Sequence, residues 1–273
     1  QTYVNALLDQ PQPAAARIVG VVDPYAERCR RFAELQAAGI PVFQTVEAFF
    51  AARTAALTVI SSPIHLHCPQ TCAALEGGSP VLCEKPVGAT IQEVRRMMAA
   101  RDRSKRFVAI GYQWSFSPAV QALKADVMAG RFGRPKQLRT LVLWPRNEVY
   151  YGRNSWAGAQ RGPRGEWILD SPANNATAHY LHHMLYILGS QVDRSAVPVS
   201  VTAELYRANP ITNFDTVAAR VRTECGAEVL FYASHAVGTT RGPEFVFAFE
   251  HGVVRYEGRG QPLVAEFADG SRH

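Results

Sequence analysis

The chain has 273 residues, of which 47% are hydrophobic and 19% are charged, and its formal net charge at pH 7 is +6. This balance is typical of a globular protein with room for one large domain or two ordinary ones. No run of about eighteen apolar residues is present, so no membrane-spanning helix is predicted. The basic residues are scattered along predicted helices, which argues against nucleic acid as a partner.

The five cysteines are odd in number and form no framework of regular spacing, which suits a reducing cytoplasm. Cys68 and Cys72 lie one helical turn apart. We interpret them as small side chains of a buried helix face, because no further ligand follows at zinc spacing. The sequence therefore predicts a cytoplasmic protein without a metal site.

Strands and helices alternate along the first third of the chain. Apolar, β-branched runs predict strands at residues 17–22, 41–43, 57–61, 80–83 and 107–112. Helices are predicted between them at residues 24–38, 46–53, 65–76 and 91–103, with capping residues at Asp23, Thr45 and Thr90. Strands separated by helices predict an α/β protein with a Rossmann-type, doubly wound parallel sheet.

The start of the chain reads as a helix, with apolar residues repeating between Val4 and Leu8. A sheet of this kind usually opens with a strand and a glycine-rich turn for a pyrophosphate, and we expect both to lie upstream. Asp23 ends the next strand, where an acid binds the adenosine ribose hydroxyls of NAD. It favours NAD as the cofactor, with NADP as the alternative because Arg28 lies one turn further on. A plain helix cap explains Asp23 equally well.

Glu84, Lys85 and Pro86 directly follow the buried strand 80–83. Ligands of open α/β sheets bind beyond the carboxyl ends of the strands, so we expect Glu84 and Lys85 at the ligand edge. Pro86 ends the strand because it has no amide proton for a ladder. Taken alone, the tripeptide is more typical of a solvated ion pair.

Three motifs follow one another at defined spacing: Ser62-Pro63-Ile64 with His67, then Glu84-Lys85-Pro86, then Gly111 to Pro118. Together they resemble the Gfo/Idh/MocA family, the group of glucose–fructose oxidoreductase and inositol dehydrogenase. In that family Thr-Pro-Asn-x-x-His and Glu-Lys-Pro stretches lie at about this distance. His67 matches the family histidine, whereas Ser115 stands where an arginine is common.

The resemblance implies two domains, an NAD(P)-binding domain over residues 1–113 and an α+β domain over residues 114–273 for substrate binding and oligomerisation. It also implies a set of residues that contact the cofactor. These residues are Asp23, Ser61, Ser62, Pro63, His67, Glu84, Lys85 and Gln113.

The second domain opens with a predicted helix over residues 118–129 and a predicted strand over residues 135–144. The segment 145–166 has no clear period and is rich in Gly, Arg, Asn and aromatic residues, and a loop this long is usually functional. Its rings and its guanidinium and amide donors suit a polyhydroxylated ligand. An ordinary surface loop with packed aromatics explains the pattern equally well. The candidate substrate contacts are Tyr151, Arg153 and Trp156.

Asn175, His179 and His182 are spaced four and three apart, so they share one face of a predicted helix. A polar stripe of this kind beside an apolar one favours a ligand or catalytic role. Family members carry Asp-x-Gly-x-His-x-x-Asp here, so the resemblance places His179 at the catalytic histidine. Asn175 and His182 then replace two aspartates, and both replacements remove a carboxylate. A second cation at His182 would further disfavour protonation of His179.

The last part of the chain predicts antiparallel strands at residues 199–206, 216–223, 229–234, 245–250 and 252–256. The resemblance implies that these strands form a large, open, mainly antiparallel sheet. Its free face would join the subunits of a homodimer or homotetramer.

The sequence therefore predicts an NAD(P)-dependent oxidoreductase that acts on a sugar, a cyclitol or a related polyol. The resemblance places Lys85 at the developing alkoxide and His179 as the proton acceptor. Asn175 would orient the substrate, and His182 is a further candidate substrate contact. Two alternatives stay open: an NAD-dependent glycoside hydrolase or lyase that oxidises its substrate transiently, and a non-catalytic sugar or nucleotide sensor. The presence of both Lys85 and His179 argues against the sensor.

Overall fold

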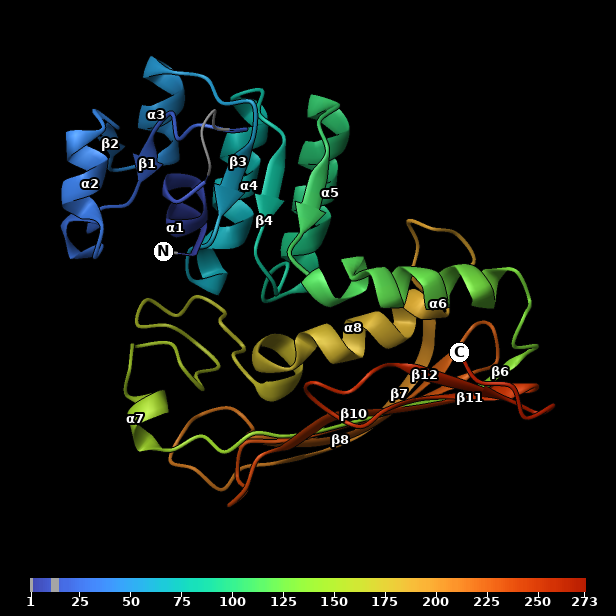
Figure 1. Cartoon of the computed structure of the whole chain (residues 1–273). Helices are drawn as coiled ribbons and strands as arrows, with labels where there is room; N and C mark the ends of the chain where they lie inside the picture. The colour runs from blue at the N-terminus through green and yellow to red at the C-terminus, as the bar shows by residue number, and fades with distance from the viewer. Residues whose placement is uncertain (1, 11–14) are drawn as a thin grey trace. The chain divides into compact units, whose positions relative to one another are not determined.

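The computed structural model describes residues 2–10 and 15–273, and the chain forms two compact units within it (Figure 1). Unit 1 comprises the chain up to Ser62, Leu66–Glu84 and Ile91–Ile110, and unit 2 comprises Pro63–His65, Lys85–Thr90 and Gly111–His273. The predicted boundary after Gln113 stays a prediction, because two short earlier segments group with the later part of the chain. No helix among the described residues is long and apolar enough to cross a membrane.

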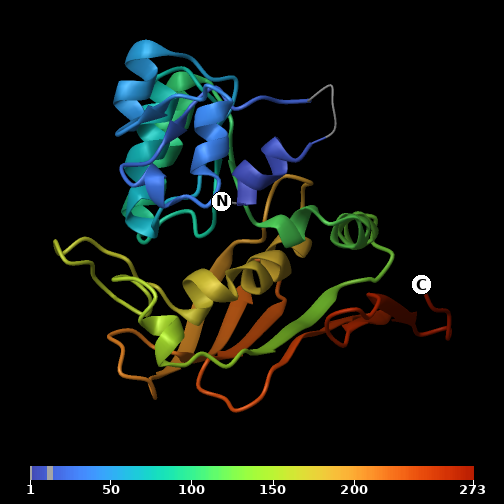
Figure 2. The same ribbon diagram turned by 60° about the vertical axis from the view of Figure 1, so that its left-hand side comes forward.

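Unit 1 contains two small parallel sheets. The first pairs β1 (Val21–Val22) with β2 (Val42–Phe43), and the second has the order β3 (Thr58–Ile60), β4 (Val81–Cys83), β5 (Val108–Ile110). The helices that alternate with these strands are α1 (Thr2–Leu8), α2 (Phe32–Ala37), α3 (Val46–Ala52), α4 (Ile64–Glu76) and α5 (Ile91–Ser104). Parallel strands with intervening helices confirm the predicted doubly wound α/β fold (Figure 2).

The single helix predicted over residues 24–38 is wrong. The structure has a 3₁₀ turn, η1 (Ala26–Arg28), and a separate short helix, α2. Asp23 accepts a hydrogen bond from the backbone amide of Tyr25 at 2.8 Å, so its side chain closes a tight local turn instead of capping a long helix. Cys29 then takes an extended conformation with ψ of 129°, which interrupts the helix before α2 begins. Propensity alone could not predict this break.

Unit 2 is built on a seven-stranded sheet with the order β12-β11-β10-β6-β9-β8-β7. The strands are β6 (Pro135–Leu143), β7 (Pro198–Tyr206), β8 (Thr216–Thr223), β9 (Glu228–Ser234), β10 (Arg241–Phe249), β11 (Gly252–Tyr256) and β12 (Val264–Phe267). Only the β6–β9 pair is parallel among these strands, so the predicted mainly antiparallel sheet is confirmed. β10 begins four residues earlier than expected, and β12 was not predicted.

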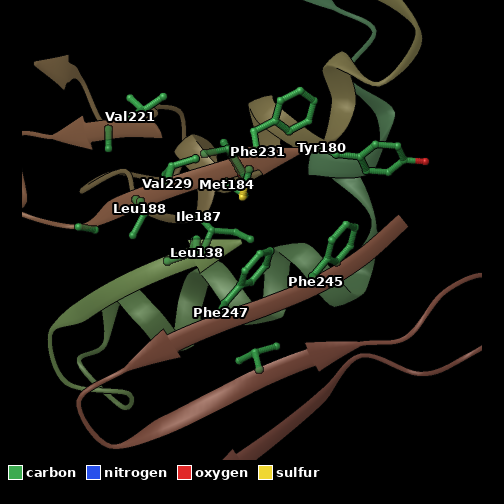
Figure 3. Close-up of a cluster of buried hydrophobic side chains, with 14 of the residues drawn as sticks. Leu138, Tyr180, Met184, Ile187, Leu188, Val221, Val229, Phe231, Phe245 and Phe247 are labelled. Atoms are coloured by element: carbon green, nitrogen blue, oxygen red, sulfur yellow. The ribbon is translucent and has the colours of Figure 1, made fainter. Parts of the chain in front are cut away.

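The core of unit 2 lies between this sheet and the helices α6 (Pro118–Met128) and α8 (Ala178–Ile187), which cover one of its faces (Figure 1). Figure 3 shows Met184 and Ile187 of α8 packed toward Leu138 of the sheet, and all three side chains are fully buried. Burial of each such side chain stabilises the fold by about 1.5–3 kcal/mol. Alternate residues of the central strands provide the rest of this core, as a two-residue period requires.

The segment before α8 is not a continuation of that helix. Residues Pro172–Ala176 form a π-helical turn, in which the amide of Thr177 donates to the carbonyl of Pro172 at 2.9 Å. The hydroxyl of Ser171 caps this turn by accepting from the amide of Asn174 at 3.1 Å. The predicted single helix through Asn175 and His182 is therefore corrected: Asn175 lies on the π-helical turn, and the two histidines lie on α8. Turns of this kind frequently occur at functional sites.

His183 is the one fully buried histidine of α8. Its ring packs against Phe245 at a centroid distance of 4.5 Å and lies near Trp114 and Phe247. Burial in this aromatic environment lowers the pKa of His183 to about 3, because the charged imidazolium would lose its hydration. The residue therefore acts as a neutral core side chain.

Replacing His183 by Phe should flatten the pH dependence of stability. Between the pKa of about 3 in the folded state and about 6.5 in the unfolded state, only the unfolded chain binds the proton, so stability falls as the pH falls through this window. One such group contributes a slope of up to about 1.4 kcal/mol per pH unit. The check is the free energy of urea unfolding from pH 4.5 to 7.5, with the exposed His251→Gln as control. Equal slopes in wild type and His183→Phe would contradict the assignment.

Candidate active site

The centre of the site is the contact between Lys85 and Asn175, which are ninety positions apart in the chain and both belong to unit 2. The Lys85 ammonium donates to the backbone oxygen of Asn175 at 2.8 Å and to its side-chain Oδ1 at 2.6 Å. Both residues are half-buried. Charge-assisted bonds of this length are the stronger kind, so one asparagine fixes the position of the ammonium group.

The other end of the Asn175 amide is engaged by a residue that the sequence did not single out. Nδ2 of Asn175 donates to Oδ1 of Asp170 at 2.6 Å. The second carboxylate oxygen of Asp170 accepts from the amide of Gly158 at 2.7 Å, and the side chain is buried. Asp170 lies between the long loop and the predicted helix, so neither pattern drew attention to it. An acidic residue just before the Asn-Asn pair is the only signal that the sequence offers.

Tyr112 contacts two of the three histidines of α8. Its ring meets that of His179 edge-on at a centroid distance of 6.0 Å and stacks flat on that of His182 at 4.0 Å. His179 is half-buried and lies four residues after Asn175. The structure therefore brings Lys85 and Asn175 into contact and places Tyr112 against the imidazoles of His179 and His182. The grouping of His179 with Lys85 stays a prediction.

His182 has a different environment from His179. Its Nδ1 lies 2.9 Å from the hydroxyl of Ser115. Burial, with a smaller contribution from the Lys124 charge, lowers the pKa of His182 to about 4. Its imidazole is therefore neutral at neutral pH, and the expectation that it acts as a second cation beside His179 is wrong. The cause is burial, which spacing along a helix does not reveal.

The predicted substrate loop contains a short helix, α7 (Glu148–Tyr151), and a stack of guanidinium groups and rings. The Arg146 guanidinium lies 4.5 Å from the centroid of the Tyr150 ring. The Arg153 guanidinium lies 3.6 Å from that ring and 5.4 Å from the ring of Trp156. Arg153 and Trp156 thus share one cluster, and their role as substrate contacts stays a prediction.

Tyr151 takes a separate position at the start of this loop. Together with Asp170 and Ala176 it lines a pocket that His235 also borders. The Tyr151 hydroxyl and the Nε2 of His235 are buried without a hydrogen-bond partner. The pocket therefore joins the loop to the turn that carries Asn175, and Figures 1 and 2 both show α7 near the start of α8.

In unit 1, three predicted cofactor contacts follow parallel strands at their carboxyl ends. Asp23 follows β1 and is exposed, and Ser61 and Ser62 follow β3. A carboxylate and hydroxyls at this edge are the groups that a dinucleotide site requires, so the residues present fit NAD. Pro63 and the exposed Gln113 belong to unit 2.

His67 and Glu84 have partners inside unit 1. The buried ring of His67 lies with Nε2 at 2.9 Å from the carbonyl oxygen of Ser62, to which it donates. The hydroxyl of Ser62 donates to Gln70 at 2.6 Å. Glu84 accepts from the hydroxyl of Tyr3 at 2.7 Å, and burial together with this carboxylate raises the pKa of Tyr3 to about 12. These bonds hold the turn after β3 and the end of β4 in place.

No cluster of three metal-ligating side chains occurs within residues 2–10 and 15–273. The chemistry that the described residues offer is hydrogen bonding and proton transfer at Lys85, Asn175 and His179. A positioned ammonium and a histidine that accepts a proton are the groups that suit a hydroxyl becoming an alkoxide or carbonyl.

Two family profiles cover most of the chain. Residues 1–112 match the profile described as "Oxidoreductase family, NAD-binding Rossmann fold", and residues 120–255 match the "GFO/IDH/MocA C-terminal domain". The chain belongs to the Gfo/Idh/MocA oxidoreductase family. NAD is the cofactor that the first of these profiles names.

An inositol 2-dehydrogenase from Rubrobacter xylanophilus is 27% identical over 195 residues, which cover 71% of this chain and 51% of the relative. The chain thus spans about half the length of that relative. The WlbA dehydrogenase from Bordetella pertussis, solved with NADH and UDP-GlcNAcA, aligns with a TM-score of 0.78 at 24% identity, over 92% of this chain and 74% of the other. Levoglucosan dehydrogenase, solved with NADH and levoglucosan, aligns with a TM-score of 0.75 at 18% identity, over 98% and 73%. These structures share the fold.

Two residues at which the sequence was expected to depart from the Gfo/Idh/MocA pattern contact each other. The hydroxyl of Ser115 and Nδ1 of His182 lie 2.9 Å apart. Asn175, which replaces the first aspartate, contacts the carboxylate of Asp170 instead. Each of these side chains therefore has a hydrogen-bond partner within unit 2.

The imidazole of His182 should remain neutral down to about pH 5, because its pKa is lowered to about 4. Its ring proton resonances, assigned by their loss in His182→Asn, should not move between pH 8 and 5.5 and should shift with a midpoint near 4. Nuclear magnetic resonance titration of the histidine ring protons is the measurement. A midpoint above 6 would contradict the lowered pKa of His182.

Proposed function

We propose that this chain is part of an NAD-dependent dehydrogenase that moves a hydride between NAD and a secondary hydroxyl of a sugar, a cyclitol or a related polyol. The observation that supports it is the Lys85 ammonium fixed on Asn175, with His179 on the next helix. Membership of an NAD-binding family of oxidoreductases sets the reaction type. Because the chain spans about half of its relative, the proposal concerns the whole protein to which it belongs.

Lys85 acts on the substrate oxygen in this proposal. Removing a hydride from a secondary alcohol leaves a carbonyl, and the hydroxyl proton must leave as well. An ammonium fixed in one position can donate to that oxygen and stabilise the charge that develops on it. Bound NAD supplies the hydride acceptor.

His179 accepts the hydroxyl proton in this proposal. A neutral imidazole is the usual general base near neutral pH. Both ends of the Asn175 amide are engaged, by Lys85 and by Asp170. We therefore assign Asn175 to holding Lys85, in place of the direct substrate contact that the sequence suggested.

The substrate class follows from the loop that contains α7. Rings stacked with guanidinium groups present flat apolar faces and hydrogen-bond donors together, which suits polyhydroxylated rings. Tyr151, Arg153 and Trp156 are the proposed contacts. The relatives and structures described above are dehydrogenases of inositol or sugar-derived compounds by name, so neither the hydrolase nor the sensor is proposed.

NAD is preferred over NADP in this proposal. Asp23 is exposed at the end of β1, where a carboxylate bonds ribose hydroxyls and repels a 2′-phosphate. Arg28, the competing residue, lies with its guanidinium 4.4 Å from the ring of Tyr25. That contact gives Arg28 a role within the turn.

A homodimer or homotetramer is part of the same proposal, supported by the edge strand β7. All nine of its residues are exposed. Val201 and Leu205 pair with Val221 and Val217, which face the core. The apolar row of β7 therefore lies on the covered face of the sheet and not on the free face that the resemblance implies for subunit contacts. An exposed apolar edge strand favours association.

Lys85→Ala should lower kcat about a hundredfold or more, because an oxyanion-stabilising donor is lost. The dissociation constant for NADH should change much less. The assay is NADH formation by the full-length protein across a panel of polyols, with binding followed by fluorescence. Lys136→Ala, which removes an exposed lysine of β6, is the matched control. Near wild-type turnover in Lys85→Ala would make Lys85 a structural charge only.

His179→Gln should remove the ionisation that controls oxidation. In wild type, kcat/KM should rise with pH through one ionisation and level off, because only the neutral imidazole accepts the proton. In His179→Gln the residual rate should be low and independent of this ionisation. His182→Asn should keep the wild-type profile, since that ring is already neutral. An active His179→Gln variant with an unchanged profile would exclude His179 as the base.

A further inference from the structure

We propose that Asp170 is a positioning residue for Lys85, which acts through the amide of Asn175. Its carboxylate fixes the orientation of that amide and supplies a negative charge one hydrogen-bonded residue away from the ammonium. The inference rests on the proposed function, because it is the reaction that requires a fixed Lys85. It places a carboxylate in the site although Asn175 has none.

The directions of the hydrogen bonds determine how the side-chain amide of Asn175 is oriented. Lys85 can only donate, so the Asn175 atom at 2.6 Å from its ammonium must be the oxygen. The amide nitrogen then faces Asp170 and donates to Oδ1 at 2.6 Å. A carboxylate only accepts, so it permits one orientation of the amide, the orientation that presents oxygen to Lys85. Asp170 therefore ensures that the oxygen of the Asn175 amide, and not its nitrogen, faces Lys85.

Asp170 is itself held in place by its surroundings. Its side chain is 4% exposed, and its second oxygen accepts from the amide of Gly158 at 2.7 Å. The preceding residue, Leu169, has a positive φ of 52°, which is strained for a non-glycine residue and persists only where the surroundings enforce it. Nδ2 of Asn174 holds the carbonyl of Leu169 at 3.2 Å. This backbone is strained where it aims Asp170 at Asn175.

Two titratable groups, Tyr151 and His235, line a pocket together with Asp170. Burial raises the pKa of the Tyr151 hydroxyl and lowers the pKa of His235, so both are neutral near pH 7. Two charged groups, Asp215 and Arg146, also act on these two residues. The buried carboxylate of Asp170 is satisfied by the amides of Gly158 and Asn175.

The experiment is an exchange of the two side chains in the full-length protein. Asp170→Asn alone leaves the amides of Gly158 and Asn175 with one shared acceptor. Asn175→Asp alone sets two carboxylates face to face, where one must take up a proton. In the double variant, Asp170→Asn with Asn175→Asp, the carboxylate now at position 175 accepts from Lys85 and from the amide now at position 170. The oxygen of that amide accepts from Gly158. Every bond is kept, and the composition equals that of the wild type.

We expect each single variant to lose about tenfold to a hundredfold in kcat, as misplacement of a catalytic group does. KM and the NADH dissociation constant should change much less, and the double variant should recover to within a few fold of wild type. Wild-type kcat in Asp170→Asn would overturn the proposal. So would a folded double variant that is no better than the worse single. If Asp170→Asn fails to fold, the double variant still decides between these outcomes.

A second readout does not depend on dehydrogenase activity. The Lys85 amine can be labelled with acetic anhydride over a range of pH and quantified by mass spectrometry. Loss of the carboxylate in Asp170→Asn should shift the pH midpoint of labelling downward, because the charged amine loses a nearby anion, and the double variant should restore it. An unchanged midpoint would remove the electrostatic role of Asp170. A different outcome would reject the proposed function instead. In that case the labelling midpoint shifts as expected in Asp170→Asn, but Lys85→Ala leaves turnover unchanged.

Discussion

The site depends on one constraint: a lysine ammonium in a half-buried position must have acceptors on the protein. Lys85 has two of them on a single residue, the backbone oxygen and the side-chain oxygen of Asn175. A neutral amide can satisfy these bonds but supplies no charge. The carboxylate of Asp170, one hydrogen bond further away, supplies that charge while Gly158 and Asn175 satisfy its own oxygens. A buried charge is stable only within such a satisfied network.

The changed residues of this chain follow one rule. Where the family pattern has an aspartate before the histidine, this chain has Asn175 and places a carboxylate at Asp170. Where the pattern has an arginine and a second aspartate, this chain has Ser115 and His182 in contact with each other. In this chain each of these residues has a hydrogen-bond partner. The role of each residue is therefore interpreted together with that of its partner.

Much of this could be predicted from the sequence, and the reasons are physical. Strand and helix periods revealed the parallel domain and the later sheet, because both bury a regular face. Lys85 and Asn175 carried local motifs, and the structure brings them together. Asp170 could not be predicted, because its role depends on a bond direction in three dimensions. The lowered pKa of His182 and the break at Cys29 were missed because burial and backbone turns override local spacing.

The site depends on the number of residues in the π-helical turn at Pro172–Ala176 as well as on which residues these are. One residue advances an α-helix by about 100°, so adding or deleting a single residue here would rotate everything before it relative to α8. Asn175 would then present different atoms to Lys85, although no side chain had been replaced. Two related chains with the same polar residues but a different number of residues in this turn would not share the same site.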